Sequence, residues 1–152
     1  MLDEILDYRR LDDRLATSGK PTDAQLHAIA DAGFGVVINL LPEESDAWNP
    51  DEEAILASRG VRHVRIPVRW TAPTLAQVDE FCAWMDRLAD QPVYVHCARN
   101  MRVSAFVYLW RMRRGFDPAQ AAADLHAIWT PDGVWAELLT AALSPALPRT
   151  HP

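Results

Sequence analysis

The stretch Pro92–Arg114 most constrains the fold of this chain, because it predicts a buried strand, a short loop and a helix in immediate succession. Residues 93–96 (Val-Tyr-Val-His) follow a proline and are mostly β-branched or aromatic, which is typical of a core strand. From Arg102 onward, apolar residues recur without strict alternation, which favours a largely buried helix. Cys97 is therefore expected at the carboxyl end of a strand and close to the start of a helix.

The charge of this stretch differs from that of the chain as a whole. The 152 residues carry a formal net charge of −6, yet no acidic residue stands between Asp90 and Asp117. Arg99 and Arg102 both follow Cys97 closely. Free backbone N–H groups and the helix dipole at a helix start favour an anion, and they favour a thiolate over a thiol. The sequence therefore predicts an anion site around Cys97.

Strand-like and helix-like segments alternate along the rest of the chain. The other expected strands are 15–18, 36–40 and 61–68, and the expected helices are 23–32, 51–59, 74–89, 102–114, 117–129 and 134–143. This alternation implies an α/β fold, a three-layer sandwich with a mostly parallel central sheet of about four to five strands and helices on both faces.

The length of the chain fits one domain, 1–152. Its core is expected over residues 14–143. Residues 1–14 are expected to form a short helix or a loose arm, and the proline-rich tail 144–152 is expected to be loose.

Ligands bind to such sheets beyond the carboxyl ends of the strands. The loops expected at that edge are 18–21, 41–46, 69–73 and 97–102. We expect these loops to share one crevice, in which Ser18, Lys20 and Trp70 are candidate neighbours of Cys97.

Composition argues against several functional classes. A sequence pI near 5.3 disfavours nucleic-acid binding. No apolar run approaches the roughly 20 residues of a membrane span, and Met1–Arg10 lacks the apolar segment of a signal peptide, so we expect a cytoplasmic protein without membrane contact. Two cysteines fit a reducing compartment. The five histidines are scattered along the chain, so we expect no metal site, and we expect no other cofactor. The oligomeric state is left open.

The residues around Cys97 supply what phosphoryl transfer to sulfur requires. A thiolate attacks phosphorus in line, loop amides hold the equatorial oxygens, and an arginine binds two of them as a fork. The residues expected around the phosphate are Ala98, Arg99, Asn100, Met101 and Arg102. His96 can hydrogen-bond this loop, and Asn100 tolerates the left-handed backbone that a tight curl needs. Without a nucleotide-binding lysine motif or a carboxylate cluster, a metal-free route is favoured.

Residues 96–104 (His-Cys-Ala-Arg-Asn-Met-Arg-Val-Ser) resemble the signature of cysteine-dependent protein phosphatases of the dual-specificity-like branch. The resemblance is strongest to a bacterial family, some members of which are fused to beta-lactamase-like hydrolase domains. It extends over residues 14–143 through 15–22, 37–40, 66–68, Trp70 with Pro73–Thr74, and Ile128–Trp129 with Pro131.

This resemblance implies the fold of a cysteine phosphatase and a cysteinyl-phosphate intermediate. It makes Cys97 the nucleophile and Arg102 the phosphate clamp, with His96 and Ser104 in support. The implied partner is a phosphorylated substrate, or a phosphate or sulfate anion.

Two departures from the signature matter. Four residues separate Cys97 from Arg102 where the signature usually has five, and Val103 stands at the usual arginine position. We expect a shorter loop in which Arg102 acts. The loop 69–73 also lacks the carboxylate that would act as general acid. Candidate substitutes on a neighbouring loop are Glu43, Glu44 and Asp46. Without an acid, only good leaving groups such as aryl phosphates would react well.

Two other functions are open on the sequence alone. A rhodanese-like sulfurtransferase would carry a persulfide on Cys97, and its short active-site loop matches the spacing here. A catalytically weak phosphate-binding module would account for the missing acid. Cys82 lies on the apolar stripe of a predicted helix and is expected in the core, with a protective disulfide to Cys97 as the alternative.

Overall fold

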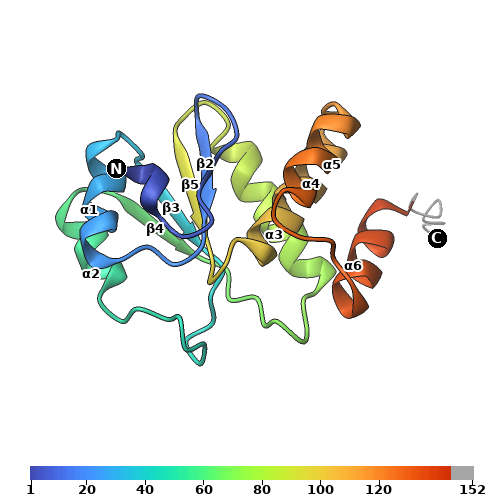
Figure 1. The fold of residues 1–152 in the computed structure, drawn as a ribbon, viewed down its shortest axis with the longest axis horizontal. Helices are drawn as coiled ribbons and strands as arrows, with labels where there is room; N and C mark the ends of the chain where they lie inside the picture. Colours follow the sequence, from blue (N-terminus) through green and yellow to red (C-terminus); the bar gives the residue numbers. More distant parts are fainter. Residues whose placement is uncertain (145–152) are drawn as a thin grey trace, which may run out of the picture.

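A five-stranded sheet lies at the centre of the fold in the computed structural model, which describes residues 1–144 (Figure 1). The strands are β1 (Arg9–Arg10), β2 (Leu15–Ser18), β3 (Val36–Asn39), β4 (Arg62–Arg65) and β5 (Val93–His96). Their order is β1-β2-β5-β3-β4, and all neighbours are parallel except β1 and β2. The predicted, mostly parallel sheet is therefore confirmed.

Helices cover both faces of this sheet. They are the short 3-10 helix η1 (Leu2–Glu4), α1 (Asp23–Asp31), α2 (Glu52–Ser58), α3 (Leu75–Arg87), α4 (Met101–Arg113), α5 (Pro118–His126) and α6 (Gly133–Leu143). Helices α1 and α2 lie on one side of the sheet and α3 to α6 on the other (Figure 1). Capping boxes at Thr22 and Thr74 begin α1 and α3. Each threonine hydroxyl accepts from the backbone N–H of the glutamine three residues later, and the side-chain oxygen of that glutamine accepts from the threonine N–H.

The core has two parts, one on each face of the sheet. Ala16, Val37 and Tyr94 pack with η1, α1 and α2, whereas the alternate strand residues pack with α3, α4 and α6. Every residue of β2, β3 and β5 is buried, as expected for parallel strands with helices on both sides.

The carboxyl ends of the four parallel strands lie in one row. In the strand register, His96 of β5 pairs with Ser18 of β2 and with Asn39 of β3, and Asn39 pairs with Arg65 of β4. The segments that follow these strands therefore leave the sheet along a single edge.

Of the two alternatives predicted for residues 1–14, the loose arm is wrong, because this segment begins with the short helix η1 and packs against the fold. Ile5 is buried at 2% exposure in the cluster under α1, and the Leu6 carbonyl accepts a hydrogen bond from Gly19 N at 2.7 Å. The next residues form β1 at the sheet edge. Burial of an apolar side chain and pairing of backbone groups outweigh the entropy of ordering this charged segment. The expected loose tail, 145–152, lies outside the described residues.

The strand predicted at 61–68 is shorter in the structure, where β4 spans Arg62–Arg65. Within residues 1–144, no helix has the length and apolar character needed to cross a bilayer.

Candidate active site

Cys97 directly follows β5 and is 0% exposed. The chain then curls for three residues before α4 begins at Met101. At Asn100 the backbone has φ 65°, the left-handed conformation predicted for this residue. The expected arrangement of strand, cysteine, tight loop and helix start is therefore present.

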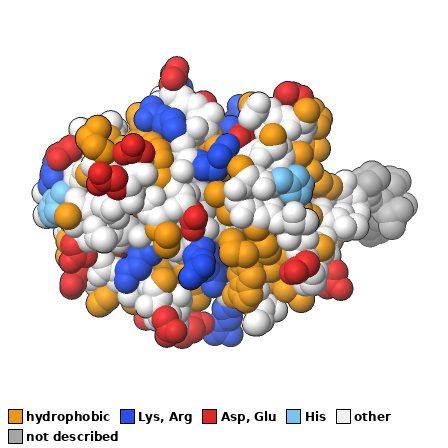
Figure 2. Space-filling view, viewed as in Figure 1, with side chains coloured by type: hydrophobic (Ala, Val, Ile, Leu, Met, Phe, Trp, Pro, Cys, Tyr) orange, Lys and Arg blue, Asp and Glu red, His pale blue; other side chains and the backbone are white. Residues whose placement is uncertain are grey.

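A cavity of about 190 Å³ opens over this loop. Its lining residues are Trp70, Cys97, Ala98, Arg99, Met101 and Arg102. Five of the six come from the loop and the first turn of α4, and Trp70 comes from the segment between β4 and α3. Lys and Arg side chains gather in the middle of the face seen in Figure 2, next to a hydrophobic patch.

Arg102 is the half-buried cation of this cavity. Its Nε is buried and has no hydrogen-bond partner among the described residues. Its guanidinium lies over the Trp70 ring, with 5.5 Å between Cζ and the ring centroid. Val103 is fully buried in the core, so the side chain at the usual arginine position faces away from solvent. The short loop thus presents Arg102 to the cavity.

Trp70 belongs to a cluster of three tryptophans. Its ring centroid lies 5.3 Å from that of Trp129 and 5.4 Å from that of Trp135. The Trp135 indole also donates to the Trp70 carbonyl at 2.8 Å. Trp70 is 39% exposed whereas Trp135 is 1% exposed, so Trp70 forms a cavity wall held in place by the core behind it.

The Cys97 loop is fixed by contacts with the N-terminal part of the chain. Asn100 Nδ2 donates to Thr17 Oγ1 and to the carbonyl of Asp7, both at 2.9 Å. The amide of Lys20 donates to the Ala98 carbonyl at 3.0 Å. The contacts with Thr17 and Asp7 were not predictable from the sequence, because they depend on tertiary pairing.

Gly19 passes close to the same loop. A Cβ at Gly19 would lie 2.5 Å from the Ala98 oxygen, a distance that real Cβ atoms essentially never show. Ser18 is fully buried and donates its hydroxyl to the Gly19 carbonyl, while Lys20 is exposed. Both expected crevice residues lie beside the loop, but neither lines the cavity.

Ser104 supports the first turn of α4. Its hydroxyl donates to the Met101 carbonyl at 3.0 Å and accepts from the Trp129 indole at 3.1 Å. The Trp129 indole also donates to the Met101 carbonyl at 2.9 Å. These bonds hold the helix start, and none of the side-chain hydrogen bonds in residues 1–144 joins Ser104 to Cys97.

The candidate acids lie on the surface outside this cavity. Glu43 pairs with Arg65 at 3.0 Å and Glu44 with Arg69 at 2.9 Å, and all three carboxylates, including that of Asp46, are exposed. Of the described side chains that line the cavity, none is a carboxylate.

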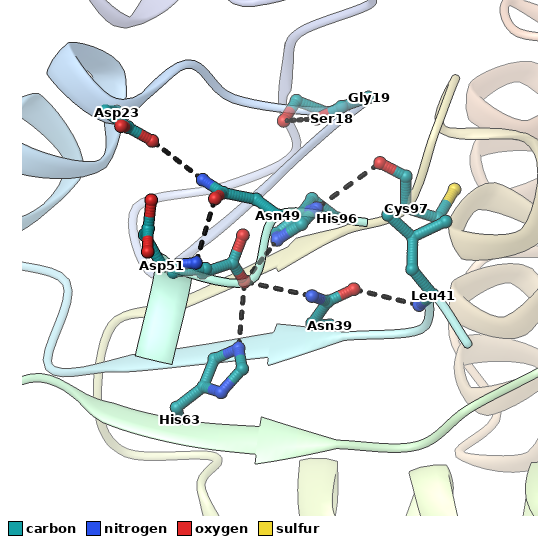
Figure 3. Close-up of polar contacts among 11 residues, drawn as sticks. Ser18, Gly19, Asp23, Asn39, Leu41, Asn49, Asp51, His63, His96 and Cys97 are labelled. Carbon is teal, nitrogen blue, oxygen red and sulfur yellow. Dashed lines mark hydrogen bonds and ion pairs between the residues drawn. The ribbon is translucent and has the colours of Figure 1, made fainter. Parts of the chain in front are cut away.

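A buried carboxylate that sequence reasoning missed lies behind the loop. Glu52 is 2% exposed, and its Oε2 faces His96 Nε2 at 2.7 Å, His63 Nε2 at 2.8 Å and Asn39 Nδ2 at 3.0 Å (Figure 3). Burial alone would raise the pKa of Glu52, but His96 and His63 outweigh burial and lower this pKa to about 2. The acidic start of the helix 51–59 predicted only a favourable interaction with the helix dipole.

Both cysteines are free thiols. Cys82 is buried in α3, as predicted, with its Sγ 3.9 Å from Arg113 Nη1. Within the described part of the chain, no group of three or more His, Cys, Asp or Glu side chains is arranged to hold a metal ion.

Comparison with known proteins assigns the family. The sequence profile described as "DSP-PTPase phosphatase fused to NAD+ Kinase" matches residues 4–136. This chain belongs to that family. The resemblance seen in the sequence is therefore confirmed, and the family and the fold are those of dual-specificity-type phosphatases.

Solved structures share the fold of this chain. A DUF442 protein from Shewanella putrefaciens CN-32, described as a candidate phosphatase, is 34% identical to this phosphatase-family chain; the match covers 93% of each chain and has a TM-score of 0.83. The core catalytic domain of the PP-IP phosphatase SIW14 from S. cerevisiae, at 12% identity, shares the fold with a TM-score of 0.74 over 89% of this chain and 84% of that one.

A beta-lactamase hydrolase-like protein of Agrobacterium fabrum is 28% identical over 98 residues, which are 61% of this chain. The match spans only 22% of that longer relative.

Proposed function

We propose that this chain hydrolyses phosphate monoesters through a cysteinyl-phosphate on Cys97, with Arg102 as the phosphate clamp. One observation carries the proposal: Cys97 and Arg102 line the same cavity, and the buried Nε of Arg102 has no hydrogen-bond partner within residues 1–144. A planar guanidinium binds two phosphate oxygens as a fork, and a buried donor without a partner is costly unless an anion fills its place. Membership of a phosphatase family supports this assignment.

The proposed reaction has two displacements. In the first, the thiolate of Cys97 attacks phosphorus, the P–O bond to the leaving group breaks, and its electron pair stays on the leaving oxygen. In the second, water attacks the phosphorus, a proton passes to solvent, the P–S bond breaks and the thiolate returns. Arg102 and the helix start of α4 balance the charge on the equatorial oxygens in both steps.

The cavity lining indicates which substrates would react well. Because no described lining residue is a carboxylate, the leaving oxygen receives no proton from the cavity wall. Substrates whose leaving group is stable as an anion, such as aryl phosphates, therefore fit best. The exposed ring of Trp70 offers a surface on which an aryl group can stack.

The deciding experiment measures hydrolysis of para-nitrophenyl phosphate by the wild type, Cys97→Ser and Cys82→Ser. We expect turnover in the wild type and in Cys82→Ser, and none in Cys97→Ser. Rapid denaturation during turnover should trap the intermediate, seen as a mass increase of about 80 Da, that of one phosphoryl group, on the peptide containing Cys97. Unchanged turnover in Cys97→Ser would refute the cysteinyl-phosphate route.

A phosphate-binding module with weak catalysis is a second candidate, favoured by the cavity lining. It predicts that vanadate or phosphate binds the wild type while turnover of every tested ester stays at the level of Cys97→Ser. Sulfur transfer, the other alternative open on the sequence, predicts a persulfide on Cys97 after thiosulfate treatment. Mass spectrometry of the Cys97 peptide tests it directly.

A further inference from the structure

The buried cluster behind the cysteine loop places two histidines on one carboxylate oxygen. His96 and His63 both direct Nε2 at Oε2 of Glu52, at 2.7 and 2.8 Å (Figure 3). Their side chains are 1% and 4% exposed, so water does not supply alternative partners freely. The contacts of the second nitrogen of each ring therefore indicate where the proton and the charge are held.

His96 has an acceptor at each end of its ring. Nε2 faces the Glu52 carboxylate, and Nδ1 faces the carbonyl oxygen of Cys97 at 3.3 Å. A neutral imidazole has only one N–H and would leave one of these contacts as a repulsion between two acceptors. Only the doubly protonated ring donates to both.

His63 has the opposite environment. Its Nδ1 is buried and has no partner among the described residues. A proton on Nδ1 would leave a buried, unsatisfied donor on a charged ring, which is unfavourable. A neutral ring that donates through Nε2 leaves only an unpaired acceptor at Nδ1, which costs less than an unpaired donor on a charged ring, so the geometry assigns the positive charge to His96 and not to His63.

We propose that Glu52 is a positioning residue that holds His96 as an imidazolium next to Cys97, where its charge stabilises the cysteine as a thiolate. This inference rests on the proposed function, in which Cys97 is the nucleophile. Glu52 itself reaches neither Cys97 nor the cavity, and it acts through His96. His96 contacts the backbone carbonyl of Cys97 itself, and in a buried site, where the effective dielectric constant is low, a charge held on this ring acts strongly on the ionisation of the adjacent cysteine.

The surroundings of His96 contain few other groups that could take this role. From α2 it meets Glu52, and from β4 His63 reaches the same oxygen. Its partners in the strand register, Ser18 on β2 and Asn39 on β3, are neutral. Because the pKa of Glu52 is lowered to about 2, its charge persists through the whole pH range of an enzyme assay.

The test measures the rate at which iodoacetamide alkylates Cys97 as a function of pH, in a Cys82→Ala background. Alkylation follows the thiolate fraction and requires no phosphatase turnover. In Glu52→Gln we expect the midpoint of the profile to move upward by about one pH unit, which is tenfold slower alkylation below the midpoint. Glu53→Gln is the matched control, because it removes the same charge from an exposed neighbour in α2 and should leave the profile in place.

A second variant guards against loss of the fold. His96→Gln should shift the profile as Glu52→Gln does. The double variant should shift no further, because each single change already abolishes the positive charge of His96. An unmoved alkylation profile in folded Glu52→Gln or His96→Gln would overturn the inference and leave Glu52 a purely structural residue. Absence of phosphatase turnover with a shifted profile would instead overturn the proposed function alone.

Discussion

The guanidinium of Arg102 lies over the ring of Trp70, 5.5 Å from its centroid, so the proposed phosphate clamp and the cavity wall are in direct contact. The Trp70 backbone is tied in turn to Trp135. The loop 69–73, where the phosphatase signature family would carry its general acid, is thus anchored to the core and contributes an aromatic ring to the cavity.

Replacing this ring should weaken binding of aryl phosphates. Trp70→Ala removes the stacking surface and the cation–π contact with Arg102, so we expect KM for para-nitrophenyl phosphate to rise about three- to tenfold, the equivalent of roughly 1 kcal/mol. Trp70→Phe should retain most of the binding. Trp84→Phe is the control, because Trp84 packs against Arg62 and Arg87 and does not line the cavity.

The acidity of the leaving group should control the rate. Without a carboxylate in the cavity lining, alkyl phosphates should react roughly 10²- to 10⁴-fold more slowly than aryl phosphates, the usual contribution of a general acid. Steady-state rates across a series of substituted phenyl phosphates check this through the slope against leaving-group pKa. A flat series would mean that an acid does reach the leaving oxygen.

Gly19 should be sensitive to a single methyl group. Gly19→Ala forces its Cβ against the Ala98 oxygen, so the loop around Cys97 must shift, and we expect a loss of about 1–3 kcal/mol in unfolding free energy and at least about tenfold in turnover. Gly35→Ala is the matched control, because a Cβ there meets nothing within 4 Å. Equal effects of the two changes would contradict the close approach of Gly19 to the Ala98 carbonyl.

Asn100 should matter both for its backbone and for its amide. Asn100→Ala loses the tolerance for φ 65° and the bonds to Thr17 and Asp7, whereas Asn100→Gly keeps the backbone conformation and loses only the bonds. We expect both to lower stability in urea unfolding, with Asn100→Ala worse by about 1 kcal/mol. A more stable alanine variant would argue against a strained loop.

Glu52 should make stability fall in acid. Its pKa is lowered in the folded state, from 4.5 to about 2, so the stabilisation is present above the unfolded pKa and is lost as the pH falls from about 5 toward 2. The shift corresponds to roughly 3 kcal/mol. Urea unfolding across this range should show the loss in the wild type and in Glu53→Gln, and a flatter dependence in Glu52→Gln.

The sequence predicted the elements of the fold well, and it placed the strand, the cysteine loop and the helix start where the structure has them, because these depend on local signals. Hydrophobic runs separated by helix starts and glycine stops indicated the strands and helices on both faces. The loop from Cys97 to Arg102 was recognisable because its cysteine, left-handed asparagine and arginine are consecutive in the chain.

The residues that hold this loop were not predictable, because their partners are far away in the sequence. Nothing near Glu52 indicates that its side chain turns inward to meet His96 instead of solvent, and Asp7 contributes only a backbone carbonyl. Arg111 lies near the end of α4, where a charged side chain usually reaches solvent, yet it is 3% exposed and donates to Asp124 on α5 at 2.6 Å. Such choices follow from tertiary packing.

The anchors of the Cys97 loop have a consequence for how the site forms during folding. The partners of Asn100, His96 and Met101 lie 28 to 93 residues away along the chain. Such non-local contacts form only after their loops have closed, so the proposed anion site is completed with the global fold and not before it. A peptide that spans Cys97–Arg113 would carry the chemical groups of the site without its geometry.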